Sequence, residues 1–174
     1  MRLLKSFFLT IAGFFIVITI VSLLMPSEVI TSRTILIIAK PGVIMGEVKD
    51  LNNWREWHPL FASQKVEVSG NAGGQLAVWN VNGKTNQLRF TSATDQQAIF
   101  DVIQSGENIQ QNKITVLQST DSDNVQVEWS ALTRLKWYPW EKFAGIFVDK
   151  ITGAGYETAL QSLKTHVEKI SREN

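Results

Sequence analysis

The first hydrophobic segment of the chain is long enough to cross a membrane. Residues 7–25 contain no charged side chain, and as a helix these 19 positions span roughly 28 Å, at about 1.5 Å per residue. That length approaches the hydrocarbon thickness of a bilayer, and Pro26 is expected to end the helix. The pattern predicts a transmembrane anchor in residues 1–26, which binds the membrane through residues 7–25 and carries one domain, residues 27–174.

A cleaved signal peptide is the alternative interpretation of this segment. Its apolar run would be shorter and would end at small residues, whereas large residues precede Pro26 here. We therefore favour an uncleaved, single-pass helix. The positive charges of Arg2 and Lys5 predict a cytoplasmic N-terminus and a domain on the outer, periplasmic or extracytoplasmic side, although Arg33 and Lys40 leave only a small bias.

The segments that follow alternate between apolar and polar positions, as strands do. Residues 28–38 are rich in Val, Ile and Thr and predict a first strand. Residues 43–49 and 50–57 predict two short helices, with Asp50 as N-cap of the second and Pro59 ending it. Asn82-Gly83 is typical of a type I′ hairpin turn. Further strands are predicted over residues 66–69, 75–81, 87–93, 98–103, 114–117 and 125–131.

The C-terminal segment changes to a helical period. Residues 140–151 predict a helix, which Gly153-Ala154-Gly155 is expected to bend or interrupt. Beyond this point an apolar stripe recurs at steps of four, three, four and three, through Tyr156, Leu160, Leu163, Val167 and Ile170. The stripe is expected to cover one face of a curved antiparallel sheet, which gives an α+β fold.

Charge and composition exclude several functions. Without Arg2 and Lys5, the 17 basic residues fall to 15 against 16 acidic ones, a net charge of −1 that predicts no affinity for nucleic acid. The chain has no Cys and two His, so we expect neither a metal site nor another cofactor. It has six Trp, however, and such an aromatic excess indicates a bulky core or an apolar cavity.

Three stretches carry a resemblance to a known superfamily. Residues 50–59, Asp-Leu-Asn-Asn-Trp-Arg-Glu-Trp-His-Pro, resemble the double-tryptophan signature of the SRPBCC superfamily, which includes START-like and polyketide cyclase-like domains. Residues 74–79 and 138–153 are similar to its glycine-and-tryptophan strand and to the run before its last helix. The likeness is to the membrane-anchored bacterial branch, and residues 83–86 depart from the usual Gly-x-Gly hairpin.

The resemblance implies a helix-grip fold, in which a curved antiparallel sheet wraps a long C-terminal helix and leaves a cavity between them. We therefore expect a membrane-anchored binding module that holds a hydrophobic small molecule or lipid. No catalytic constellation is evident. The candidate cavity-lining residues are large apolar or aromatic side chains on the inward positions: Trp57, Trp79, Phe90, Phe100, Trp129, Tyr156, Leu160 and Leu163.

Two other function classes stay open. An enzyme of the cyclase or aromatase kind needs a proton carrier in the cavity, for which His58 and Tyr156 are the candidates, although His58 is expected to be a solvated loop residue. An envelope interaction protein could instead use the aromatic segment of residues 137–140, which could equally lie at the level of the lipid headgroups.

Overall fold

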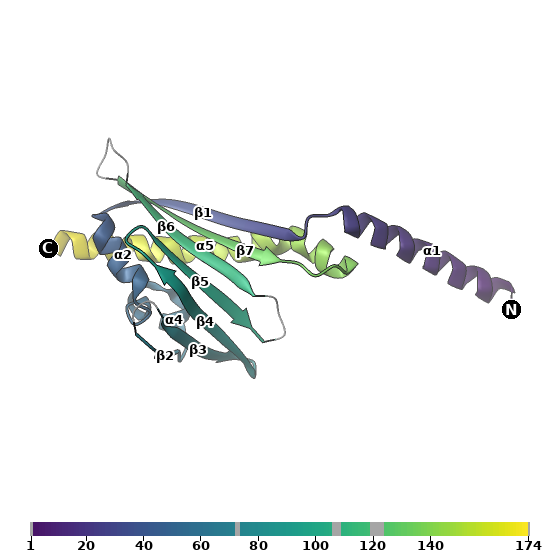
Figure 1. Cartoon of the computed structure of the whole chain (residues 1–174), viewed down its shortest axis with the longest axis horizontal. Coiled ribbons are helices and arrows are strands. Elements are labelled where there is room, and N and C mark those ends of the chain that lie inside the picture. Colours follow the sequence, from purple (N-terminus) through teal and green to yellow (C-terminus); the bar gives the residue numbers. More distant parts are fainter. Residues whose placement is uncertain (1, 72–73, 106–108, 119–123, 174) are drawn as a thin grey trace.

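The computed structural model describes residues 2–71, 74–105, 109–118 and 124–173. Within these ranges an N-terminal helix, α1 (Arg2–Leu24), precedes an α+β arrangement of seven strands and four further helices (Figure 1). The strands are β1 (Glu28–Ile38), β2 (Glu67–Ser69), β3 (Leu76–Val81), β4 (Lys84–Ala93), β5 (Gln97–Gln104), β6 (Gln110–Gln118) and β7 (Asn124–Arg134). The helices are α2 (Pro41–Lys49), α3 (Trp54–Trp57), α4 (Pro59–Ser63) and α5 (Pro139–Glu173).

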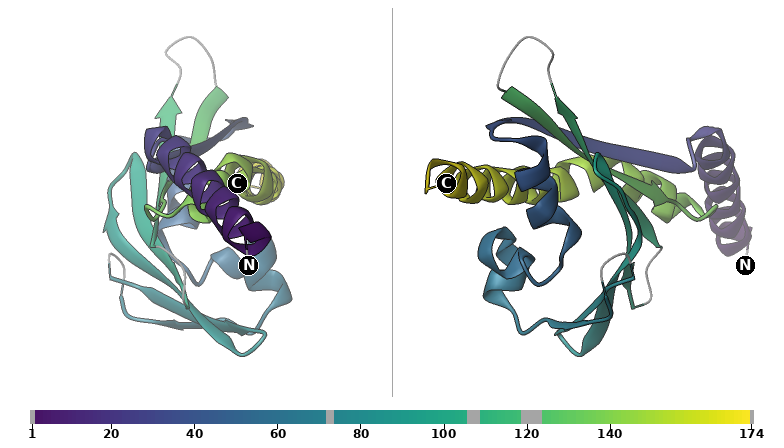
Figure 2. Two further views of the ribbon diagram at one scale, coloured as in Figure 1. Left: turned by 90° about the vertical axis from the view of Figure 1, so that its right-hand side faces the viewer. Right: turned by 60° about the vertical axis from the view of Figure 1, so that its left-hand side comes forward.

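The strands form one curved antiparallel sheet that wraps around α5 (Figure 2). Their order is β1-β7-β6-β5-β4-β3-β2, so the first strand closes against the last one, with Glu28 opposite Arg134 and Ile38 opposite Asn124. A register shift between Phe90 and Ser92 interrupts the β4–β5 ladder, and such bulges increase local twist and bending. The predicted α+β, helix-grip fold is confirmed.

Local sequence signals set the tight turns of the sheet. Asn82 and Gly83 join β3 to β4 with φ angles of 51° and 76°, which are the positive values that a type I′ turn requires. The predicted hairpin is therefore confirmed. On the last strand, Val125, Val127, Trp129 and Ala131 all point inward and are buried, as the period of two predicts.

The short helices begin and end differently from the prediction. Helix α3 begins at Trp54 rather than at Asp50. The Asp50 carboxylate instead accepts hydrogen bonds from the backbone N–H of Asn52 and the side chain of Gln75, at 2.9 and 2.8 Å, and these bonds lower its pKa. Pro59 does not only end a helix but occupies the first turn of α4, where its missing N–H costs no hydrogen bond.

Helix α5 runs without interruption from Pro139 to Glu173, so the predicted bend at Gly153-Ala154-Gly155 was wrong. Two of its glycines are close-packed: a Cβ on Gly145 would collide with the Leu135 side chain, and one on Gly153 with the Arg33 guanidinium. Neither they nor Gly155 has a positive φ. Packing thus offsets the helix-propensity cost of glycine, which is about 1 kcal/mol per residue.

The second half of α5 packs against the sheet as the stripe predicts. Leu160, Leu163 and Val167 are buried in the core. Glu157 is exposed, as expected for the opposite face. Glu168 was expected to face water but is only partly exposed, because its carboxylate accepts a hydrogen bond of 3.1 Å from the backbone N–H of Ile38.

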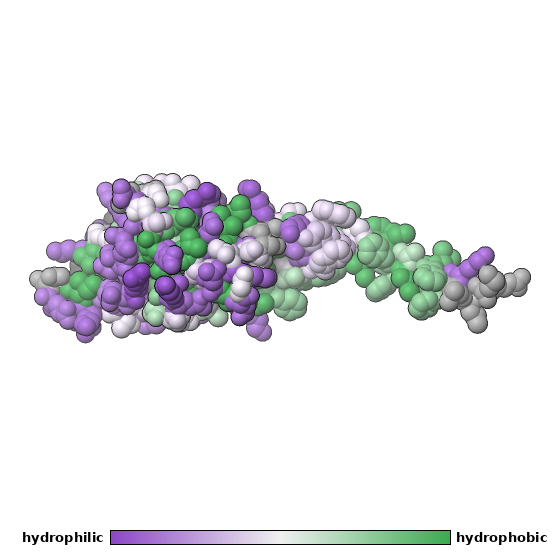
Figure 3. Space-filling view, turned by 90° about the horizontal axis from the view of Figure 1, so that it is seen from below, coloured by the Kyte–Doolittle hydropathy of each residue, from purple (hydrophilic) through white to green (hydrophobic). Residues whose placement is uncertain are grey.

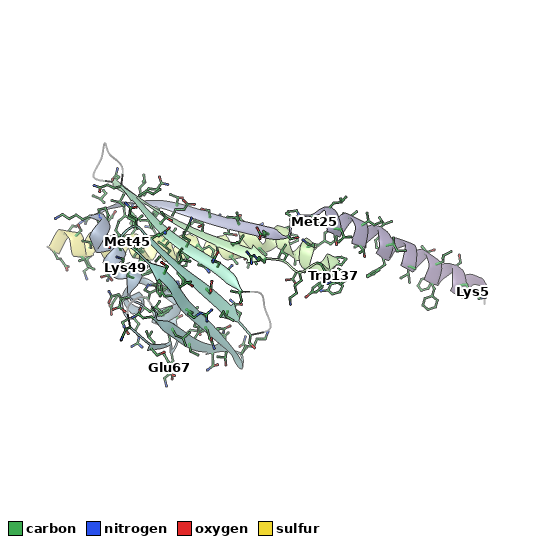
Figure 4. All side chains as sticks on the ribbon, viewed as in Figure 1. Lys5, Met25, Met45, Lys49, Glu67 and Trp137 are labelled. Atoms are coloured by element: carbon green, nitrogen blue, oxygen red, sulfur yellow. The ribbon has the colours of Figure 1, made fainter. Side chains whose placement is uncertain are left out.

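Helix α1 leaves the domain at the end where α5 begins. The buried Lys142 ammonium donates to the carbonyl oxygens of Met25 and Pro26 and, at 2.6 Å, to the hydroxyl of Ser27. Met25 and Trp137 accordingly lie at the same end of the domain (Figure 4). The helical segment from Lys5 to Leu24 is long and apolar enough to cross a membrane, a property that signal sequences share. Hydrophobic side chains cover most of α1 (Figure 3).

Candidate functional site: an aromatic groove under helix α5

A cavity of about 440 Å³ lies between α5, the sheet and the short helices α3 and α4. We call it the aromatic groove. Its floor is aromatic, its wall carries a few polar groups, and its rim on α5 is exposed. The lining residues include Trp54, Phe61, Trp79, Phe100 and Trp129 on the floor, His58, Gln110, Asn112 and Tyr156 on the wall, and Ile151, Gly155 and Thr158 at the rim.

Trp129 stands at the centre of the groove. Its ring stacks on Tyr156 at a centroid distance of 4.9 Å, with Phe100 and His58 each at 5.8 Å. Trp54, which anchors α3 through a 2.9 Å hydrogen bond to the carbonyl of Val48, lies 6.1 Å away. Ring contacts of this kind are individually worth about 0.5–1.5 kcal/mol beyond burial, so the floor is a rigid aromatic surface.

The polar groups of the wall are bonded to one another. Trp129 Nε1 donates to Asn112 Oδ1 at 3.0 Å, and Asn112 Nδ2 donates to the carbonyl of Gln110 at 3.2 Å. The Gln110 side chain accepts from Tyr156 Oη at 2.9 Å and donates to Thr133 Oγ1 at 3.0 Å. Because these groups satisfy each other, the wall is suited to a mostly apolar ligand.

His58 lies in the groove and not in solvent, so the expectation of a solvated loop residue was wrong. The chain between α3 and α4 turns the ring inward, where it stacks on Trp54 at 5.0 Å. Burial lowers the pKa of His58 to about 4. The ring is therefore neutral at pH 7, and because Nδ1 accepts from the backbone N–H of Leu60 at 3.3 Å, its proton sits on Nε2.

Tyr156 is also held in its neutral form. Burial raises the pKa of its hydroxyl to about 12, and the hydrogen bond to Gln110 opposes that rise. A general acid or base works best with a pKa near the operating pH. Neither Tyr156 nor His58 meets that condition in the structure, although both line the same groove and both contact the ring of Trp129.

A second cavity of about 490 Å³ adjoins the first along the beginning of α5. We call it the proximal extension, because it runs toward the end of the domain from which α1 leaves. It shares five lining residues with the aromatic groove: Val102, Gln104, Gln110, Ile151 and Thr152. Beyond them it reaches Leu135, Glu141 and Gly145. The two cavities together follow the flank of α5 over several turns.

The structure divides the predicted cavity-lining residues into two groups. Trp79, Phe100, Trp129 and Tyr156 come together in the lining of the groove. The other four are buried outside it: Trp57, Phe90, Leu160 and Leu163. Trp57 instead borders a separate surface cavity beside the second half of α5. Period and residue type predict which side of an element faces inward, but not which side chains meet the groove and which meet packed neighbours.

Sequence reasoning missed other residues of the groove. Trp54 is absent from the predicted lining, yet its fully buried ring forms part of the groove floor. Asn112 and Gln110 carried no recognisable signal because alternation assigns polar residues to the outside. Asn112 instead faces inward next to Ile114 and is fully buried.

Comparison with known proteins gives structural but no sequence relatives. No protein-family model matches the chain, and no curated protein matches it. Among solved structures, a protein of unknown function from Staphylococcus aureus shares 14% identity at a TM-score of 0.66, covering 84% of this chain and 97% of that one. Norcoclaurine synthase from Thalictrum flavum shares 14% at 0.65, covering 82% and 95%.

A third similar structure is a di-domain aromatase/cyclase, StfQ, from the steffimycin biosynthetic pathway. It shares 9% identity at a TM-score of 0.65, and the match covers 82% of this chain and 51% of that one. At such low identities these likenesses show the fold alone. The shared fold is a curved antiparallel sheet around a long C-terminal helix, as in the cyclase and the synthase.

Proposed function

We propose that this protein is a membrane-anchored binding module that holds a hydrophobic small molecule or lipid in the aromatic groove. The observation that carries the proposal is the groove itself: about 440 Å³, floored by tryptophan and phenylalanine rings, with wall polar groups that are largely satisfied by one another. Pockets of a few hundred Å³ with this lining are typical of small-molecule sites. Helix α1 serves in this proposal as the anchor, with the domain on the outer side of the membrane.

Gly155 offers a way to close the groove without disturbing the fold. It lines the groove, and a Cβ placed on it meets no atom within 4 Å. Gly155→Leu should therefore place its side chain in the open volume. Ala154→Leu is the matched control, because Ala154 is exposed, precedes Gly155 on the same helix and does not line the groove.

The test is mass spectrometry of small molecules that copurify with the full chain in mild detergent. Wild type and Ala154→Leu should carry the same hydrophobic molecule in similar amounts, and Gly155→Leu should carry much less. Equal content in all three proteins, or none in any of them, would refute binding in the groove.

A cyclase-like or aromatase-like enzyme is the second candidate, favoured by one observation: His58 and Tyr156 line the same groove. Their displaced pKa values argue for binding over proton transfer. Comparing the mass of the copurifying molecule between wild type and Tyr156→Phe distinguishes the two. Different masses indicate turnover in the groove, and the same mass indicates binding alone.

A further inference from the structure

One face of α5 changes character halfway along the helix. Following the outward positions at steps of three and four, the first half presents Trp140, Phe143, Phe147 and Ile151, all of them exposed. The same line continues through Ala154 into Thr158, Gln161, Thr165 and Lys169, which are also exposed. Positions with this spacing share one face of a helix. A single face is therefore apolar near α1 and polar far from it.

The apolar part, which we call the proximal stripe (Trp140, Phe143, Phe147 and Ile151), is too exposed to belong to the core. Trp140, Phe147 and Ile151 are 65%, 59% and 74% exposed. The stripe extends about 16 Å along the helix at 1.5 Å per residue. Contiguous apolar surface of this kind marks a contact with another molecule or a membrane.

The position of the proximal stripe indicates what covers it. It begins at the end of the domain where Lys142 bonds to Met25, Pro26 and Ser27, directly after α1. With α1 in a bilayer, the start of α5 lies at the membrane surface. Trp137 and Trp140 are exposed there, and tryptophan favours the headgroup region. The exposed Lys136 and Lys150 lie beside the stripe and suit anionic headgroups.

We propose that the proximal stripe docks α5 onto the lipid bilayer and thereby turns the rim of the aromatic groove toward lipid. Ile151 connects the two features, because it belongs to the stripe and lines both cavities. Hydrogen bonds from Lys142 hold the chain at Met25, Pro26 and Ser27 against the start of α5. Tilt of the spanning helix from the bilayer normal, about 20° on average and up to about 40°, therefore brings the start of α5 down toward the membrane surface.

The proposal rests on α1 acting as the membrane anchor, as in the proposed function, and adds a source for the ligand. A hydrophobic molecule dissolved in the bilayer would reach the rim at Ile151 and Gly155 without crossing water. The ligand class is therefore a membrane-partitioned lipid or similarly apolar molecule.

The chain contains no Cys, so single cysteines can be labelled without background. Phe147→Cys tests the stripe, and Thr165→Cys, exposed on the same face in the polar half, is its matched control. Each full-length variant is spin-labelled and reconstituted into vesicles of phosphatidylcholine and phosphatidylglycerol. Accessibility is then measured to oxygen, which partitions into lipid, and to a water-soluble nickel chelate.

The proposal expects the label at position 147 to be accessible to oxygen and shielded from nickel, with the opposite ranking at position 165. Two results would overturn it. Equal nickel accessibility at both positions would place the stripe in water. Shielding of position 147 from both reagents, with dipolar broadening between labels, would mean that a second copy of the chain covers the stripe.

A further variant separates this proposal from ligand binding. Phe147→Glu should weaken docking in vesicles, yet in detergent it should retain the wild-type amount of copurifying molecule, since Phe147 does not line the groove. Absence of that molecule in every variant would refute groove binding and leave docking standing. Docking of this variant is measured by adding Trp140→Cys and labelling position 140. If that label stays accessible to oxygen and shielded from nickel despite Phe147→Glu, the docking role of Phe147 is refuted.

Discussion

The two halves of α5 belong to one uninterrupted helix but differ in what they bury and what they expose. Residues 156–173 bury Leu160, Leu163 and Val167 in the core and expose a polar face to solvent. Residues 139–155 pack through glycines and a buried lysine, border both cavities and expose large apolar side chains. The large buried apolar side chains of α5 thus lie in its far half, residues 156–173, whereas its near half, residues 139–155, borders the proximal extension.

The largest expected effect lies in the far half. Leu163→Ala removes a fully buried side chain and should lower the free energy of unfolding by about 2–5 kcal/mol. Phe147→Ala in the near half removes a larger but mostly exposed side chain and should change it by less than about 0.5 kcal/mol in detergent. Urea unfolding followed by circular dichroism measures both, and equal losses would abolish the distinction between the halves.

Acid should weaken the fold through His58 at the groove. Its pKa is about 4 in the folded state against an ordinary value of 6.5, so the unfolded chain binds the extra proton between these values. Stability present at pH 7 should decline as pH falls from about 6.5 to about 4, by up to about 3 kcal/mol. His58→Phe should flatten that decline. A wild-type and variant pair with the same pH dependence would show that His58 is not buried uncharged.

Two small substitutions compare the halves at nearly adjacent positions. Ala159→Ser places a hydroxyl in the core and should cost about 1–3 kcal/mol, since Ala159 is only 2% exposed. The Cβ of Gly155→Ala meets open space in a regular helix, so this substitution should raise the free energy of unfolding by about 0.5–1 kcal/mol. This order reverses what a bend at Gly155 would give. Thermal melts of both variants decide between the two orders. A melting temperature lower for Gly155→Ala than for Ala159→Ser would support a bend at Gly155.

The smallest effect is expected for Lys164→Ala. Lys164 pairs with Glu168 at 3.8 Å, one turn along the helix and partly exposed. Such pairs contribute about 0.3–0.5 kcal/mol. A loss above about 1 kcal/mol in the urea experiment would show that the polar face of the far half carries more of the stability than its burial indicates.

Much of the fold was predictable because its signals are local. Alternation specified the inward residues of β7, the Asn82-Gly83 pair specified a hairpin, and spacing specified the core stripe of the far half. The bend at Gly153 was a false prediction because propensity ignores tertiary contacts, here the close approach of Arg33.

The site was less predictable, since a cavity is defined by what is missing between elements. Leu163 and Tyr156 lie on one apolar stripe, yet only Tyr156 reaches the groove. His58 appeared to be a loop residue because the sequence does not show that α3 and α4 turn their connection inward. Asn112 needed the partner ring of Trp129, 17 positions away, to make its burial favourable.

The groove's own tryptophans test the central claim most directly. Trp54, Trp79 and Trp129 line it, so a brominated fatty acid bound there should quench their fluorescence in a full chain in which Trp137→Phe and Trp140→Phe remove the exposed signals. The account predicts saturable quenching that unbrominated fatty acid reverses, that Ala154→Leu retains and that Gly155→Leu abolishes. Quenching that never saturates, or that Gly155→Leu leaves unchanged, would contradict a ligand site under α5.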